Sequence, residues 1–149
     1  VILSINLDGV FNVTHAFLDQ LRATKGRIVN IGSIQSFVHV NWPNSAAYTT
    51  SKHGVLGFTR ALAAELGKEG IRVNALSPGP VNTPLLIELF AKDPERAARR
   101  LVHIPLGRFA EPSEIAAAVA FLASDDSSFM TASNFLVDGG ISGAYVTPL

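Results

Sequence analysis

The chain of 149 residues is 48% hydrophobic and 16% charged, and its twelve basic side chains balance its twelve acidic ones. This composition predicts one globular domain, residues 1–149, with enough apolar material for a core, and it excludes a disordered segment. The balanced charge argues against nucleic acid or an anionic membrane as a partner, since Arg96, Arg99 and Arg100 form only a local basic patch.

The first third of the chain predicts a helix, a buried strand and a loop. Apolar residues recur at helical spacing from Leu3 to Leu21 and no Met stands at position 1, so we expect the chain to begin inside a fold. Residues 27–31 form a short apolar run, which is typical of a strand buried on both faces. Residues 34–45 contain Pro43 and lack helical periodicity, which predicts a loop.

A long helix is expected next, from about Tyr48 to Leu66, because apolar residues recur there every three or four positions before Gly70. A strand is expected at 71–76, and the proline-rich run 77–84 is expected to end it. Apolar runs and proline positions predict the remaining elements: a strand at 134–137, and helices around 85–90, from Pro94 with Asp93 as N-cap, and from Pro112 after Glu111.

Buried strands that alternate with helices imply a parallel sheet covered by helices, which is a doubly wound α/β architecture. Ligands bind at the carboxyl ends of the strands in such sheets. The residues that follow the predicted strands are therefore of interest: Gly32 and Ser33, Pro78 and Gly79, and Gly139 and Gly140.

Tyr48 and Lys52 stand one helical turn apart in the long helix. A tyrosine with an ordinary pKa of about 10 is a poor base near neutrality. An ammonium about 5 to 6 Å away, at an effective dielectric of about 20, favours the phenolate by roughly 3 kcal/mol, and the helix N-terminus adds to this. Chance supplies such a pair about one time in twenty, so the spacing alone does not establish a site.

Other motifs surround this pair. In chain order the motifs are Asn6-x-x-Gly9, Asn30-Ile-Gly-Ser33, Tyr48-x-x-x-Lys52, Arg72-Val-Asn74, Pro78-Gly79-x-Val81-x-Thr83 and Asp138-Gly139-Gly140. Their order and approximate spacing, over nearly the whole chain, resemble the short-chain dehydrogenases/reductases. The resemblance implies a catalytic tetrad of Asn6, Ser33, Tyr48 and Lys52, and a nicotinamide cofactor, NAD or NADP.

Each tetrad residue has a role implied by the resemblance. Tyr48 would be the general acid/base, and Ser33 would hydrogen-bond the substrate oxygen. Lys52 would favour the phenolate and bind the nicotinamide ribose, and Asn6 would hold a water in a proton relay. Structural alternatives stay open: Ser33 could cap its loop and Asn6 could be a surface amide of a helix.

The resemblance also implies that the cofactor contacts Tyr48 and Lys52, together with residues that follow the second strand: Pro78, Gly79, Val81 and Thr83. Thr83 has an alternative, because a threonine before a proline is ordinary turn chemistry. Asn30 and Asn74 are more typical of side chains that satisfy backbone groups.

The chain departs from the family pattern in three ways. Ser33 precedes Tyr48 by fifteen positions, whereas the family usually has thirteen, so the intervening loop is longer. Gln35 stands thirteen positions before Tyr48. Gly32 and Ala132 stand where the family often has serine and glycine. No glycine-rich phosphate loop is present. The chain therefore corresponds to the later part of a Rossmann-type domain without its N-terminal phosphate-binding half of about 100 residues; we expect it to bind dinucleotide poorly alone and to need that half for folding.

The implied reaction is hydride transfer between the cofactor and a secondary alcohol or carbonyl. Substrate choice is expected in residues 35–44, which include Gln35, His39, Asn41 and Trp42, and in residues 83–106, whose Leu85, Leu86, Leu89 and Phe90 would form a lid. These side chains and the tail 143–149 resemble the sugar dehydrogenases of the family, glucose dehydrogenase among them, with a 3-oxoacyl reductase as the rival. A catalytically idle dinucleotide-binding or scaffolding relative is the alternative from another class. The family usually assembles as homotetramers.

Absent residue types restrict the remaining functions. The chain has no cysteine, which excludes disulfides and thiolate chemistry and agrees with a cytoplasmic location. Its four histidines lack the spacing of metal ligands, so no metal is expected. Its longest apolar stretches fall short of the about 20 residues of a membrane-spanning helix, and the N-terminus does not resemble a signal peptide.

Overall fold

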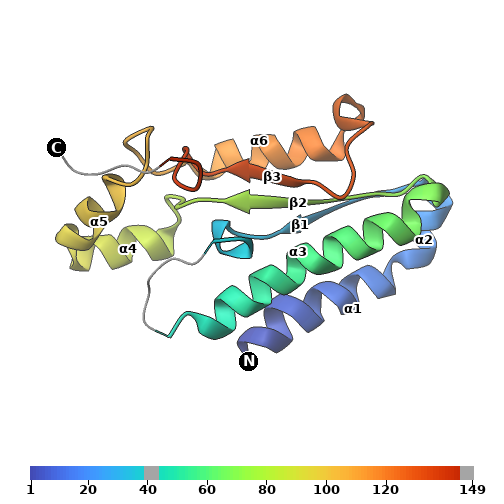
Figure 1. The fold of residues 1–149 in the computed structure, drawn as a ribbon, viewed down its shortest axis with the longest axis horizontal. Coiled ribbons are helices and arrows are strands. Elements are labelled where there is room, and N and C mark those ends of the chain that lie inside the picture. Colours follow the sequence, from blue (N-terminus) through green and yellow to red (C-terminus); the bar gives the residue numbers. More distant parts are fainter. Residues whose placement is uncertain (39–43, 145–149) are drawn as a thin grey trace.

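The computed structural model describes residues 1–38 and 44–144, which form a parallel sheet between layers of helices (Figure 1). The strands follow the chain in the order β1 (Arg27–Ile31), β2 (Arg72–Pro78) and β3 (Asn134–Val137). Ile31 pairs with Leu76, and Pro78 pairs with Val137. All three strands therefore end at the same edge of the sheet, as the α/β prediction requires.

Helices cover both faces of the sheet and its carboxyl edge (Figure 1). One side carries α1 (Gly9–Ala16), α2 (Leu18–Thr24) and the long α3 (Ala46–Leu66), and the other carries α6 (Pro112–Ala123). Beyond the strand ends lie α4 (Pro84–Lys92), α5 (Pro94–Leu101) and the 3₁₀ turn η2 (Ile34–Ser36). Two further 3₁₀ turns, η3 (Gly67–Glu69) and η4 (Asp125–Ser127), follow α3 and α6.

Two predicted boundaries differ from the structure. The second strand continues to Pro78, although the prolines were expected to end it earlier. A proline cannot donate to the ladder, but Gly79 N donates to Val137 O at 3.0 Å and continues the pairing past it. Residues 34–36, expected as loop, form the turn η2, because Ser33 caps it.

The predicted first helix is interrupted twice. It opens as a π-helix, η1 (Ser4–Asp8), and continues as α1. Phe17, with φ −104° and ψ 8°, separates α1 from α2. The apolar spacing from Leu3 to Leu21 persists across both interruptions, which is why the sequence pattern predicts one helix.

The core lies where α3 meets the sheet, and its centre is the buried cluster of Ala63, Leu66, Ile71 and Val73. On the other side of the sheet, Leu122 of α6 is fully buried. Burial of such side chains stabilises the fold by about 1.5 to 3 kcal/mol each. This packing fixes the direction of α3 relative to β1 and β2.

A buried hydrogen bond adds to the contact between α3 and β1. Asn30 Nδ2 donates to Thr59 Oγ1 at 2.9 Å, and both residues are buried. The Asn30 partner is thus a side chain and not the backbone group that we expected. Thr59→Val should lower the free energy of unfolding by about 1 to 3 kcal/mol, because the Asn30 amide is then buried without its acceptor. Urea denaturation measures the loss, and Thr50→Val, at an exposed position of the same helix, is the control. Equal effects of the two substitutions would contradict this prediction.

Arg72 and Asn74 hold the turn that precedes β3. Arg72 donates hydrogen bonds to the carbonyls of Leu122, Ser124 and Met130 at 2.9 to 3.1 Å. Asn74 Nδ2 donates to Met130 O, and its Oδ1 accepts from Ser133 N. Ala132 within this turn has φ 58°, a conformation that the glycine often found in the family adopts at lower cost. The expectation that Asn74 satisfies backbone groups is confirmed.

One edge of β1 has no strand beside it among the described residues. A groove of about 680 Å³ runs along this edge between β1 and α1. Its lining is mostly apolar, and Val13 and Phe17 are 62% and 57% exposed. Within residues 1–38 and 44–144, no helix combines the length and apolarity needed to cross a bilayer.

Candidate active site

The candidate residues gather at the carboxyl edge of the sheet. Ser33 follows β1, Pro78 ends β2, and Tyr48 is in the first turn of α3. Helix α3 also packs against η2, the turn that begins directly after Ser33. Residues predicted from separate motifs are therefore brought to one end of the fold.

Ser33 caps the turn η2, as the structural alternative for this residue expects. Its Oγ accepts from Gln35 N at 3.2 Å, and Ser33 N donates to Ser36 Oγ at 3.1 Å. Capping does not exclude chemistry, because a hydroxyl that accepts one hydrogen bond keeps its own O–H to donate. Gly32 precedes it in a crowded place: a Cβ there would lie 2.8 Å from Ser36 Oγ and 2.9 Å from Ser77 Oγ.

Tyr48 and Lys52 share one face of α3. Lys52 Nζ lies over the Tyr48 ring, 5.7 Å from its centroid, and donates to Ile31 O at 2.8 Å. Burial lowers the pKa of Lys52 from its ordinary value. An ammonium has three N–H donors, so two remain after the bond to the end of β1. The arrangement places a cation beside a phenol ring at the edge where ligands bind.

Asn6 is joined to α3 through a serine. Asn6 Nδ2 donates to Ser51 Oγ at 3.1 Å, and Ser51 Oγ donates to Tyr48 O at 2.7 Å. Close packing supports the contact, because a Cβ on Gly54 would lie 2.9 Å from Leu7 Cδ1. Ser51, which is fully buried, was missed by sequence reasoning. Its signal was present: it stands three residues after Tyr48, on the same helical face.

The segment after β2 contacts the end of β3 and a residue that precedes α6. Gly79 lies against β3, since a Cβ on it would be 2.9 Å from both Asp138 Cα and Asp138 O. Val81 forms an isolated parallel bridge with Ala110. Thr83 caps α4 by accepting from Leu86 N at 3.3 Å, which confirms ordinary turn chemistry for its hydroxyl.

A second contact crosses from η2 to α3. Thr49 Oγ1 donates to Gln35 Oε1 at 2.7 Å. The sequence placed Gln35 at a family position and in the loop expected to select the substrate, but it did not predict this bond. No local pattern predicts it, because the two residues are separated by the longer loop.

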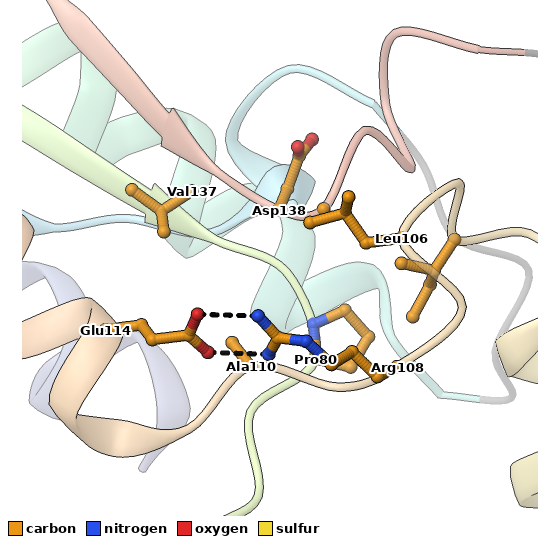
Figure 2. Close-up of a pocket in the computed structure, with 9 residues that line it drawn as sticks. Pro80, Leu106, Arg108, Ala110, Glu114, Val137 and Asp138 are labelled. Atoms are coloured by element: carbon orange, nitrogen blue, oxygen red, sulfur yellow. Dashed lines mark hydrogen bonds and ion pairs between the residues drawn. The ribbon is translucent and has the colours of Figure 1, made fainter.

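An ion pair borders a small cavity beside these elements (Figure 2). The cavity holds about 60 Å³ and is lined by Pro80, Leu106, Val137 and Asp138, among others. Arg108 donates to both carboxylate oxygens of Glu114 at 2.7 and 2.8 Å. Glu114 also accepts from Glu111 N at 2.8 Å, which closes a capping box at the start of α6. The Arg108 hydrogen bond, followed by that backbone bond, lowers the pKa of Glu114 to about 2.

This carboxylate predicts a pH dependence of stability. Because the folded pKa of about 2 is below the ordinary 4.5, the contribution of Glu114 is fully present above pH 4.5 and is lost as pH falls through about 2. Glu114→Gln should therefore flatten the decline of the thermal midpoint between pH 5 and pH 2. Glu88→Gln, which removes an exposed ion pair with Lys92, is the matched control. An unchanged pH profile in Glu114→Gln would refute the assignment.

The predicted lid corresponds to α4 and α5. Leu85 is 79% exposed, whereas Phe90 is buried and stacks on Phe109 with ring centroids 5.1 Å apart. On α5, Arg99 of the basic patch pairs with Glu95 at 3.3 Å. The expected substrate residues His39, Asn41 and Trp42 lie outside the described residues, as does the tail from residue 145. No group of three potential metal ligands is found in the part of the chain that the structure describes.

Fold and site together define a parallel-sheet α/β domain with a tyrosine, a lysine and a serine at its carboxyl edge. The profile of the family described as Enoyl-(Acyl carrier protein) reductase matches residues 1–142. The chain belongs to the short-chain dehydrogenase/reductase family. The predicted family and fold class are thereby confirmed.

Three relatives illustrate the similarity. A 3-oxoacyl-[acyl-carrier-protein] reductase of Thermotoga maritima is 42% identical over 141 residues, which cover 94% of this chain and 55% of the relative. An inactive 2-(S)-hydroxypropyl-CoM dehydrogenase 2 of Xanthobacter autotrophicus is 42% identical over 144 residues, covering 94% and 62%. The crystal structure of a gluconate 5-dehydrogenase from Burkholderia cenocepacia, in complex with NADP and tartrate, has a TM-score of 0.86 and 34% identity and covers 94% and 54%. The chain thus spans roughly half the length of such relatives.

Proposed function

We propose that these residues form the catalytic part of a longer NAD(P)-dependent oxidoreductase that interconverts a secondary alcohol and a carbonyl. The observation that carries the proposal is the Tyr48–Lys52 pair, with Nζ 5.7 Å from the ring centroid and bonded to the carboxyl end of β1. Membership of the family supports the same reaction class.

In the proposed mechanism Tyr48 donates its phenolic proton to the carbonyl oxygen during reduction, and accepts it back during oxidation. Ser33 donates its O–H to the same oxygen and stabilises the negative charge that develops there. Lys52 holds its ammonium beside the Tyr48 ring and keeps two N–H donors for the cofactor. Asn6 acts through Ser51, whose bond to Tyr48 O steadies the first turn of α3.

The residues present fit a nicotinamide cofactor. Lys52 keeps two donors for ribose hydroxyls after its bond to Ile31 O. Pro78 at the end of β2, and Gly79, Val81 and Thr83 directly after it, would line the nicotinamide face. When bound, the cofactor supplies or accepts the hydride. The choice between NAD and NADP is expected to be made in the N-terminal half.

We propose a small polyol or sugar acid as the substrate class. The loop 35–44 and the lid α4–α5 would select it. The gluconate 5-dehydrogenase among the similar structures supports this choice. The Thermotoga maritima reductase supports the rival, a 3-oxoacyl thioester. A homotetramer and a cytoplasmic location remain predictions, and sedimentation of the full-length enzyme tests the first.

The test uses the full-length enzyme with both cofactors. Polyols, sugar acids, cyclic ketones and a 3-oxoacyl thioester are scanned by nicotinamide absorbance, and deuteride transfer from labelled cofactor to product is then measured. Turnover with transfer of the label to a carbinol carbon is the expected result. Turnover confined to the thioester would reject the proposed substrate class but not the reaction.

A catalytically idle nucleotide-binding protein is the second candidate. The inactive relative of Xanthobacter autotrophicus, at 42% identity, favours it, because it demonstrates that an inactive protein can be this similar in sequence. The candidates differ in one readout. Nicotinamide binding by fluorescence without turnover on any substrate would favour the idle protein, and Tyr48-dependent turnover would reject it.

A further inference from the structure

We propose that Gln35 is a positioning residue that couples Ser33 to the helix of Tyr48; this inference rests on the proposed function. Gln35 is half-buried in η2 and makes a contact on each side. Its backbone N–H donates to Ser33 Oγ at 3.2 Å, and its side-chain Oε1 accepts from Thr49 Oγ1 at 2.7 Å. One residue therefore touches the serine hydroxyl and the neighbour of the tyrosine.

This link is short compared with the chain that joins the two groups. Ser33 and Tyr48 are separated by fourteen residues, a longer connection than the family usually has. A longer loop defines the relative positions of its ends less well. The Gln35–Thr49 bond bypasses the loop, since it joins η2 directly to the first turn of α3.

The hydrogen bond from Gln35 N to Ser33 Oγ also determines which part of the Ser33 hydroxyl is available to a substrate. A serine hydroxyl has one proton to donate and two lone pairs. Because Gln35 N–H occupies a lone pair, the O–H remains to donate to a substrate oxygen. The Thr49 bond fixes the Gln35 side chain and, through it, the direction of that N–H. Displacing a group that contacts the reacting atoms by about 1 Å costs on the order of a hundredfold in rate.

Matched variants of the full-length enzyme separate positioning from general stability. Gln35→Ala and Thr49→Val each delete the bond, whereas Thr49→Ser retains the donor. We expect the deleting variants to lower kcat about tenfold to a hundredfold, with the cofactor KM and the thermal midpoint nearly unchanged. The retaining variant Thr49→Ser should stay within threefold of the wild type. The double variant Gln35→Ala/Thr49→Val should lose no more than the worse single variant, because both delete one interaction.

Three results overturn the proposal. They are a kcat of Thr49→Val within twofold of the wild type, losses that multiply in the double variant, and a fall of kcat in Thr49→Ser equal to that in Thr49→Val. A wild type without Tyr48-dependent turnover would reject the proposed function instead. The coupling is then read without catalysis, by hydrogen exchange of the Gln35 amide: exchange at least tenfold faster in Thr49→Val, but not in Thr49→Ser, supports the coupling, and unchanged exchange overturns it.

Discussion

Replacing Tyr48 with phenylalanine is expected to lower kcat of the full-length enzyme by about 10²- to 10⁴-fold, the range of general acid/base catalysis. The substitution removes only the hydroxyl. The ring remains under Lys52 Nζ, 5.7 Å from its centroid, and the bond from Ser51 Oγ to Tyr48 O is a backbone contact that any residue keeps. We therefore expect the cofactor KM to change by less than about threefold, since the loss concerns the transition state.

Initial rates across substrate and cofactor concentrations measure both parameters. Thr50→Val is a suitable control, because it also removes one hydroxyl from the first turns of α3 but at an exposed position. It should leave kcat within twofold of the wild type. A Tyr48→Phe enzyme that keeps more than a tenth of the wild-type kcat would mean that another group transfers the proton.

Gly79→Ala is expected to reduce both stability and activity. The new Cβ would lie 2.9 Å from Asp138 Cα and Asp138 O, backbone atoms that cannot rotate away, so the ends of β2 and β3 must separate. Overpacking of this kind costs about 1 to 3 kcal/mol in the free energy of unfolding. The displaced segment leads to Val81 and Thr83, and its shift should lower kcat/KM by about a hundredfold.

Gly57→Ala is the matched control for this substitution. Apart from the adjacent residues and backbone of its own helix, no atom of the described residues lies within 4 Å of a Cβ at Gly57, which is inside α3. Alanine should therefore leave activity unchanged and raise the free energy of unfolding by up to about 1 kcal/mol, because glycine is unfavourable within a helix. Urea denaturation and initial rates test both variants, and similar results for the two would contradict the steric argument.

Elements with local signals could be predicted from the sequence. The bounds of β1 and β3 agree with the apolar runs, and Asp93 caps α5 by accepting from Arg96 N, as its position before Pro94 predicts. Tyr48 and Lys52 were placed on one helical face by their spacing alone. Each of these features depends on residues fewer than about six positions apart.

Features that depend on distant residues could not be predicted in this way. The Gln35–Thr49 bond crosses the loop, and the Asn6–Ser51 bond joins residues 45 positions apart. Neither donor nor acceptor has a sequence pattern that identifies its partner. The π-helix η1 was also missed, because its apolar spacing is indistinguishable from that of an α-helix over five residues.

The edge of β1 that lacks a neighbouring strand among the described residues bears on how the proposed enzyme would tolerate recombination. A strand that pairs there forms main-chain hydrogen bonds, which are the same for every sequence, and covers a groove lined by aliphatic side chains such as Val10 and Ile28. Pairing at this edge depends on strand register and on side-chain volume more than on residue identity. Under the proposed function, nucleotide-binding halves of different family members would be exchangeable in principle, so that cofactor preference and alcohol chemistry could evolve separately on the two sides of one strand pair.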